Sequence, residues 1–147
     1  MLIVYTKKRH VEKLKKFLTS NDIPNEILTD DESPKINEFD LGVSYCYPKK
    51  INSELLKLPK KGFINYHPGL LPKYKGPNEY NDAINNRELN WGVSLHYMTE
   101  EFDSGEIIKT KLIQLHEPPN SVEELGAISH FFLFELFKET ILQIYFN

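Results

Sequence analysis

The sequence has few of the features that mark secreted, membrane or nucleic-acid-binding proteins. It contains a single cysteine, Cys46, among 147 residues, which excludes an intramolecular disulfide framework and indicates a reducing compartment. No hydrophobic run approaches the length of a membrane span, and the apolar start of the chain is too short for a signal peptide. The net charge of −3 provides no global attraction to nucleic acid. We therefore expect a cytoplasmic protein without a membrane segment or a nucleic-acid partner.

The apolar residues that are present suffice for one folded domain. They make up 40% of the chain, and no repeat, linker or low-complexity tract divides it, so we expect a single domain over residues 1–147. Apolar runs and helical periods alternate in the first half, which predicts an α/β fold with a mostly parallel, Rossmann-like sheet. The expected strands are 2–5, 25–28, 39–45 and 62–67, followed by an antiparallel pair at 91–98 and 106–115. The expected helices are 11–18, 51–56, one that starts near residue 77, and a closing helix from a capping box at Ser121 to about residue 144.

The segment 62–76 carries the first candidate site. An apolar lead-in ends in Asn65 and His67, and prolines, glycines and basic residues follow. Residues two apart in a strand point to the same side, and ligands of open α/β sheets bind at the carboxyl ends of strands. An amide beside an imidazole can stabilise and protonate an oxygen anion. A lone histidine at a strand end is more often structural, so the pattern by itself leaves both interpretations open.

Asp103 offers a carboxylate in an Asp-Ser-Gly turn between the two strands of the expected antiparallel pair. A carboxylate there can raise the pKa of an imidazole or accept a proton through water. Asp-Ser-Gly is also ordinary turn chemistry, so a purely structural role stays open.

Three linked motifs resemble one enzyme family. They are 65–76 (N-Y-H-P-G-L-L-P-K-Y-K-G), 91–98 (W-G-V-S-L-H-Y-M) and 102–108 (F-D-S-G-E-I-I), and in this order they are similar to the 10-formyltetrahydrofolate-dependent formyltransferases. That family includes the glycinamide ribonucleotide, methionyl-tRNA and sugar N-formyltransferases. The resemblance covers roughly residues 39–115. It implies a reduced formyltransferase fold, with one strand-helix unit fewer than usual before the catalytic strand.

The resemblance also implies a catalytic set of Asn65, His67 and Asp103. In the implied reaction a neutral primary amine attacks the formyl carbon on N10 of 10-formyltetrahydrofolate. Asn65 and a protonated His67 stabilise the tetrahedral oxyanion. Asp103 keeps His67 charged and assists proton transfer from the amine.

The same resemblance implies a folate pocket between the loop after the third strand and the loop before Asp103. Its expected residues are Tyr45, Tyr47, Ile51, Met98, Glu101 and Phe102. Alternatively, Tyr47 and Ile51 only cap the sheet. Alternation along 91–98 directs Ser94 and His96 toward the site, where we expect them to support the catalytic residues.

Two further interpretations concern metals and oligomers. His67, His96 and Asp103 lack a close-spaced ligand motif, so we expect no metal. The final helix has more phenylalanines than one buried stripe needs, and both core packing and a homodimer face can explain them. These residues are Phe131, Phe132, Phe134 and Phe137.

The amine acceptor is expected to be small. The turn Thr6–His10 is basic and lacks the glycines that cradle phosphate in glycinamide ribonucleotide formyltransferase, which disfavours that nucleotide. The basic cluster can still attract another anionic acceptor, or it is only a solvated turn. The absence of a second, C-terminal domain like that of the methionyl-tRNA enzymes, together with the negative charge, disfavours tRNA. Gly69 after His-Pro is similar to the sugar N-formyltransferases, which favours a nucleotide-linked amino sugar. Glycinamide ribonucleotide formylation, hydrolysis of 10-formyltetrahydrofolate, and an inactive folate-binding or interaction module remain alternatives.

Overall fold

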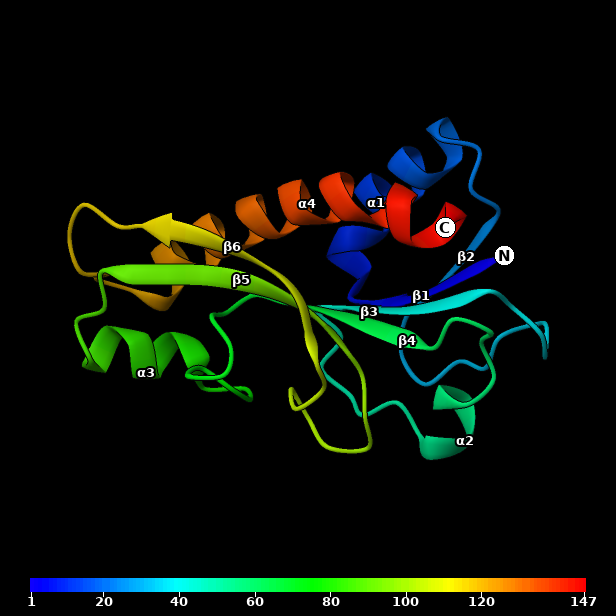
Figure 1. The fold of residues 1–147 in the computed structure, drawn as a ribbon. Helices are drawn as coiled ribbons and strands as arrows, with labels where there is room; N and C mark the ends of the chain where they lie inside the picture. Colours follow the sequence, from blue (N-terminus) through cyan, green and yellow to red (C-terminus); the bar gives the residue numbers. More distant parts are fainter.

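A six-stranded sheet in the order β2-β1-β3-β4-β5-β6 forms the centre of the molecule (Figure 1). The computed structural model describes residues 1–147. The parallel strands are β1 (Leu2–Thr6), β2 (Asn25–Leu28), β3 (Leu41–Tyr45) and β4 (Phe63–His67). The antiparallel strands are β5 (Asn90–Tyr97) and β6 (Ile107–Gln114). The predicted α/β class, with a mostly parallel sheet and an antiparallel pair, is confirmed.

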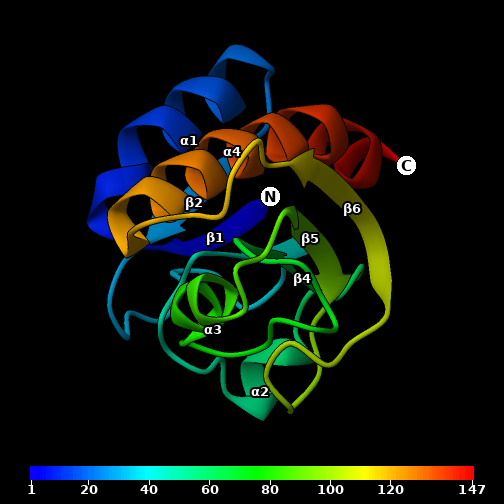
Figure 2. The same cartoon turned by 90° about the vertical axis from the view of Figure 1, so that its left-hand side faces the viewer.

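Helices cover both faces of the sheet (Figures 1 and 2). The long helices α1 (Lys8–Ser20) and α4 (Val122–Phe146) lie on one face. The short helices α2 (Ser53–Leu56) and α3 (Glu79–Asn85) lie on the other. None of these helices is both long and apolar enough to cross a bilayer.

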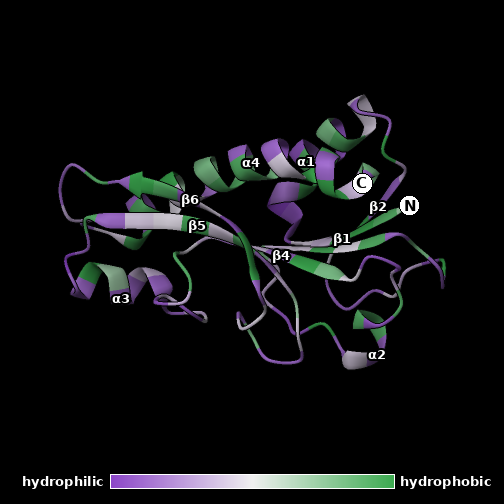
Figure 3. Ribbon diagram, viewed as in Figure 1, coloured by the Kyte–Doolittle hydropathy of each residue, from purple (hydrophilic) through white to green (hydrophobic).

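The core has two parts because successive strand residues point to opposite faces. The larger part, beneath α1 and α4, includes Val4, Val43 and Ile64, all fully buried. The smaller part on the other face includes Ile3 and Phe63. The strands β1 and β4 begin with hydrophobic residues on both faces, whereas α1 is largely hydrophilic (Figure 3). Apolar residues on both faces are typical of parallel strands that are covered on both sides.

Helix boundaries differ from the prediction where polar residues begin a helix. Helix α1 begins at Lys8, one turn earlier than the apolar period indicates, because Lys8 and Arg9 are exposed and add no apolar signal. At the start of α4, Ser121 Oγ accepts from the Glu124 N–H (3.1 Å), as the capping box predicts. The Glu124 carboxylate, however, accepts from the N–H of Asn120 instead of that of Ser121.

The phenylalanines of α4 mostly pack inward. Phe137 is fully buried, and Phe132 and Phe134 pack against the larger core. Phe131 alone among the four is strongly exposed, at 63%. The helix is apolar around most of its circumference because it lies over the sheet and against neighbouring helices. A homodimer through α4 stays a prediction, with a smaller apolar face than the sequence suggested.

Candidate active site

Asn65, His67 and Asp103 meet at the carboxyl end of β4. The pleat of β4 directs Asn65 and His67 to the same side, and the connection between β5 and β6 brings Asp103 to them. Asp103 Oδ1 lies 3.3 Å from Asn65 Nδ2 and 3.5 Å from His67 Nδ1. Only 6% of the His67 side chain and 7% of the Asp103 side chain is exposed. An amide, an imidazole and a carboxylate are therefore held together with little access to water.

The Asp103 carboxylate is fixed by its backbone and by the opposite loop. Asp103 has φ = 52°, in the left-handed region that aspartate tolerates better than most side chains. Its Oδ2 accepts a hydrogen bond from the N–H of Gly76, at 2.8 Å. Oδ2 is thus anchored, and Oδ1 is left for the other site residues.

The hydrogen bonds of His67 define which ring nitrogen carries a proton. Nε2 lies 2.8 Å from the carbonyl oxygen of Tyr74. Because a carbonyl only accepts, Nε2 is the N–H donor, and Nδ1 faces Asp103 Oδ1. A second proton on Nδ1 would therefore be shared directly with Asp103.

His96 contacts the catalytic cluster directly. Its Nδ1 lies 2.8 Å from the Tyr97 carbonyl, so Nδ1 donates and Nε2 accepts from Asn65 Nδ2, at 3.0 Å. The two amide hydrogens of Asn65 are thereby directed at His96 and Asp103. Ser94, in contrast, donates to the Gly69 carbonyl (2.9 Å) and holds the loop that follows His67.

Burial and charge shift the pKa values of His67 and Asp103. The shift of His67 differs from the expectation based on the sequence. Burial lowers the pKa of His67 and outweighs the attraction of Asp103. The structure therefore favours a neutral His67 imidazole before substrate binds, instead of the permanently protonated form that was expected. Burial tends to raise the pKa of Asp103, but the neighbouring imidazoles of His96 and His67 and the N–H of Gly76 hold it below its usual range. Asp103 is the ionised member of the pair.

The cluster opens onto a cavity of about 430 Å³. Of the residues expected around a folate, five line this cavity: Tyr47, Ile51, Met98, Glu101 and Phe102. An aromatic and apolar wall of this kind suits a flat heterocycle.

Tyr45 does not line the cavity, which corrects the prediction for this residue. It is the last residue of β3, and the pleat directs its ring into the core beneath α4, with no exposed surface. The ring lies 5.9 Å from that of Tyr66 and 5.6 Å from that of Phe137. Ser44, one residue earlier, points to the other side and lines the cavity instead.

The cavity wall also includes charged residues that the sequence pattern did not single out as site residues. Lys7 and Arg9 come from the start of α1, and Glu79 from the start of α3. Glu79 is only 8% exposed, although a charged residue at the start of a helix is normally solvated. No local signal marks it, because its burial depends on the loop that packs over it.

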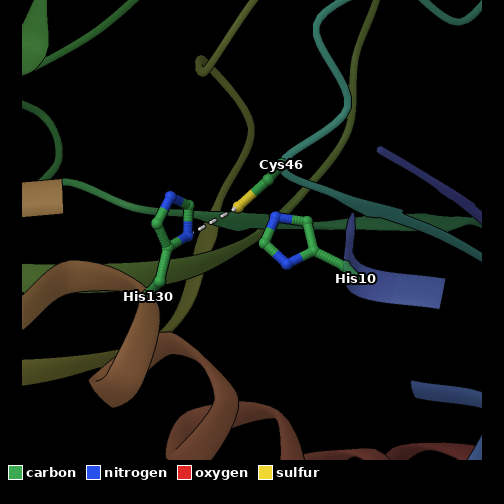
Figure 4. A group of neighbouring side chains, drawn as sticks. All are labelled: His10, Cys46 and His130. Carbon is green, nitrogen blue, oxygen red and sulfur yellow. Dashed lines mark hydrogen bonds between the residues drawn. The ribbon is translucent and has the colours of Figure 1, made fainter. Parts of the chain in front are cut away.

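His10, Cys46 and His130 converge beside the same cavity, and Figure 4 shows the thiol pointing between the two imidazoles. Their potential ligand atoms lie within 4.8 Å of one another. Arg9 already contacts both rings, with Nε 3.3 Å from His10 Nε2 and Nη2 3.2 Å from His130 Nε2. Because a guanidinium only donates, both Nε2 atoms are acceptors. The Arg9 guanidinium thus already takes up the Nε2 acceptors of both rings. The predicted absence of a metal stays a prediction.

Comparison with known proteins places these features in context. A family model described as "Formyl transferase" matches residues 4–141. The chain is 37% identical over 98 residues to a methionyl-tRNA formyltransferase of Mycoplasmopsis pulmonis, covering 67% of this chain and 34% of the relative. It is 39% identical over 82 residues to the bifunctional polymyxin resistance protein ArnA of Wigglesworthia glossinidia brevipalpis, covering 56% of this chain and 12% of that protein. The chain therefore spans about a third of the first relative and less of the second.

Solved structures share the fold. One is the phosphoribosylglycinamide formyltransferase of Streptococcus pneumoniae TIGR4, with a TM-score of 0.74, 16% identity and 97% of each chain covered. Another is an N-formyltransferase of Helicobacter canadensis in complex with folinic acid and dTDP-3-aminofucose. Its TM-score is 0.77 at 19% identity, with 97% of this chain and 62% of that chain covered.

Proposed function

This chain belongs to the formyl transferase family, and from that premise we propose that it transfers a formyl group from 10-formyltetrahydrofolate to the primary amine of a small acceptor. One observation carries the proposal. The buried side chains of His67 and Asp103 and the half-buried Asn65 lie together at the wall of a cavity large enough for a small ligand.

In the proposed reaction the acceptor nitrogen forms a bond to the formyl carbon, and the carbonyl electrons move to oxygen. Asn65 turns an N–H to this oxyanion by giving up its contact with Asp103, which at 3.3 Å is the longer of its two hydrogen bonds. His67 gains its second proton as the oxyanion forms, because the new negative charge and Asp103 together offset the cost of burial. That proton comes from the attacking nitrogen and leaves on N10 when the carbon–N10 bond breaks.

The folate position is supported by the lining of the cavity. Tyr47, Ile51, Met98 and Phe102 supply apolar and aromatic surface on the side that continues from the catalytic cluster. The Helicobacter canadensis protein was crystallised with folinic acid, and a further relative in fold, PseJ of Anoxybacillus kamchatkensis, with tetrahydrofolate. We extend this ligand class to the present chain.

The acceptor we propose is a nucleotide-linked amino sugar. Lys7 and Arg9 at the cavity wall suit the phosphates of such a molecule. The PseJ and Helicobacter canadensis structures contain sugar nucleotides. Glycinamide ribonucleotide and methionyl-tRNA are the competing acceptors, since proteins of both kinds are similar to this chain.

Release of tetrahydrofolate from 10-formyltetrahydrofolate, measured by absorbance, tests the proposal. We expect release to require an amine and to be fastest with dTDP-3-aminofucose among that sugar nucleotide, glycinamide ribonucleotide and methionyl-tRNA. Release without any amine would establish hydrolysis instead. Binding of the folate without release under any condition would establish an inactive binding module.

A further inference from the structure

Glu79 is a buried carboxylate in the wall of the catalytic cavity that the mechanism above leaves without a role. Its Oε2 atom is buried and has no hydrogen-bond partner. Burial of a carboxylate oxygen without a hydrogen-bond partner costs free energy. In a ligand cavity, a donor group of the ligand can supply the missing hydrogen bond. We propose that Glu79 binds the acceptor's ammonium group and removes one proton from it before the nitrogen attacks. This inference rests on the proposed function and extends it.

The position of Glu79 relative to the catalytic histidine supports this role. A Cβ placed on Gly69 would lie 3.0 Å from His67 Nε2 and 3.3 Å from Glu79 Cγ. The Glu79 side chain and the His67 ring therefore lie on either side of the Gly69 backbone. Both residues line the same cavity, so an amine held by Glu79 lies in the cavity that His67 faces.

Glu79 and Asp103 are two carboxylates of one cavity whose environments shift their pKa values apart. Burial raises the pKa of Glu79, and the charge of Asp103 adds to this rise. The pKa of Asp103 is held below its usual range by the Gly76 N–H and the neighbouring imidazoles, as described above. Two carboxyl groups whose pKa values are shifted apart in this way can take different roles in proton transfer. Asp103 stays ionised, whereas Glu79 can take up a proton and release it.

Other groups also face Glu79 and modify its titration. Its own N–H and Lys7 oppose the rise in pKa, whereas Asp82, on the same helix, adds to it. Cys46 after β3 and Tyr80 on α3 lie close enough for the Glu79 charge to raise their own pKa values. Lys7 is the one cation among these neighbours, and it bounds the cavity beside Glu79. A bound ammonium group would be a second cation beside Glu79, in addition to Lys7.

The proposed step balances without a further reactant. Glu79 in its carboxylate form accepts one proton from R–NH3⁺, which yields R–NH2 and a neutral carboxylic acid. The free amine then attacks the formyl carbon. After the attack the nitrogen loses one more proton, and this proton passes through His67 to N10 of the folate. Glu79 returns its proton to solvent when the product R–NH–CHO leaves.

The test compares Glu79→Gln with the wild type using dTDP-3-aminofucose as acceptor. Glutamine retains the size of the side chain but accepts no proton, so kcat should fall about 10²-fold at pH 7, a typical general-base contribution. The deficit should shrink as pH rises, because the amine then loses its proton to solvent. With hydroxylamine, which is largely uncharged at neutral pH, Glu79→Gln should retain near wild-type turnover. A merely structural role would lower the rate equally with both amines.

Glu117→Gln is the matched control, since it makes the same change at an exposed acid that does not line the cavity. It should leave both rates within about twofold of the wild type. An active wild type whose Glu79→Gln variant shows the same rate and pH profile would overturn the inference.

A binding measurement separates this inference from the proposed function. If the wild type released no tetrahydrofolate, the proposed function would fail, but calorimetry with dTDP-3-aminofucose and dTDP-fucose would still decide the role of Glu79. The wild type should bind the amine roughly tenfold more tightly, and Glu79→Gln should not distinguish the two sugars. Equal affinity of the wild type for both would refute ammonium binding.

Discussion

Asp103 Oδ1 is the atom on which the geometry of the candidate site depends. Asn65, His67 and His96 all lie within 3.3 to 3.6 Å of it, and each approaches from a strand of the sheet. In the protonation states described above, only the Asn65 amide carries a hydrogen toward this oxygen. Because this contact is long, at 3.3 Å, the Asn65 N–H can readily be redirected.

Replacement of Asn65 by alanine tests the oxyanion assignment. Loss of one preorganised donor should lower kcat for formyl transfer by about 10²–10³-fold, with a smaller effect on folate affinity. Steady-state kinetics and folate titration measure the two quantities. Asn81→Ala, at an exposed position of α3, is the control. Near-native turnover of Asn65→Ala would exclude this role.

Buried neutral histidines should make stability depend on pH. Burial and the neighbouring cations lower the pKa of His10 to about 3 and that of His130 to about 4, against an ordinary value of 6.5. The unfolded chain then binds more protons below pH 6.5, so the stabilisation is complete above that pH and is lost as pH falls toward 4. Each histidine contributes at most about 1.4 kcal/mol per pH unit in this window.

Urea denaturation at pH 7 and pH 5 measures this loss in the free energy of unfolding. His10→Phe retains an aromatic ring against Tyr45, which His10 contacts edge-on, and should reduce the loss. His116→Gln, at an exposed site after β6, should not. An unchanged pH dependence in His10→Phe would show that His10 is not neutral in the folded protein.

At the scale of elements, the connection between β5 and β6 determines where Asp103 lies. Gly105 passes so close to β5 that a Cβ on it would lie 1.6 Å from the Tyr97 carbonyl oxygen. Only glycine permits this approach. The position of Asp103, the proposed catalytic carboxylate, is therefore linked to the packing of backbone on backbone.

Gly105→Ala should consequently lower both stability and formyl transfer, because the connection must move and Asp103 moves with it. We expect a loss of about 1–3 kcal/mol in the free energy of unfolding, typical of forced backbone shifts. Gly126→Ala is the matched control, since its Cβ would meet the Tyr80 ring at an ordinary 3.6 Å within α4. Alanine there should stabilise the protein by up to about 1 kcal/mol. Thermal or urea unfolding distinguishes the two variants.

At the scale of the whole molecule, α4 closes one face of the sheet and leaves little apolar surface for a partner. Phe131 and Phe146 are the exposed phenylalanines of this helix, at 63% and 62%. A homodimer through α4 would need both the small patch at Phe131 and neighbouring polar residues.

Light scattering coupled to size-exclusion chromatography tests this predicted homodimer. If the dimer forms through α4, Phe131→Glu should shift the molecular mass from that of two chains to that of one. Glu123→Gln, at the solvent-exposed start of the helix, should leave the mass unchanged. A wild-type mass of one chain at micromolar concentration would remove the prediction.

The sequence by itself determined the fold class and the three proposed catalytic residues. Apolar runs, helical periods and glycine-containing turns are local signals, so the order of strands and helices could be predicted from residues close in the chain. Asn65 and His67 lie two residues apart on one strand, and Asp103 stands in a turn motif. Their local spacing and family motifs were sufficient to single them out.

Only the tertiary structure decided which side chains share the cavity. It placed Tyr45 in the core because the pleat of β3 alternates, and it set His96 against Asn65 by cross-strand register. It buried Glu79 next to the Gly69 backbone and lowered the pKa of His67 through burial. Burial and pKa depend on contacts between segments far apart in sequence, and no local pattern of residue types encodes them.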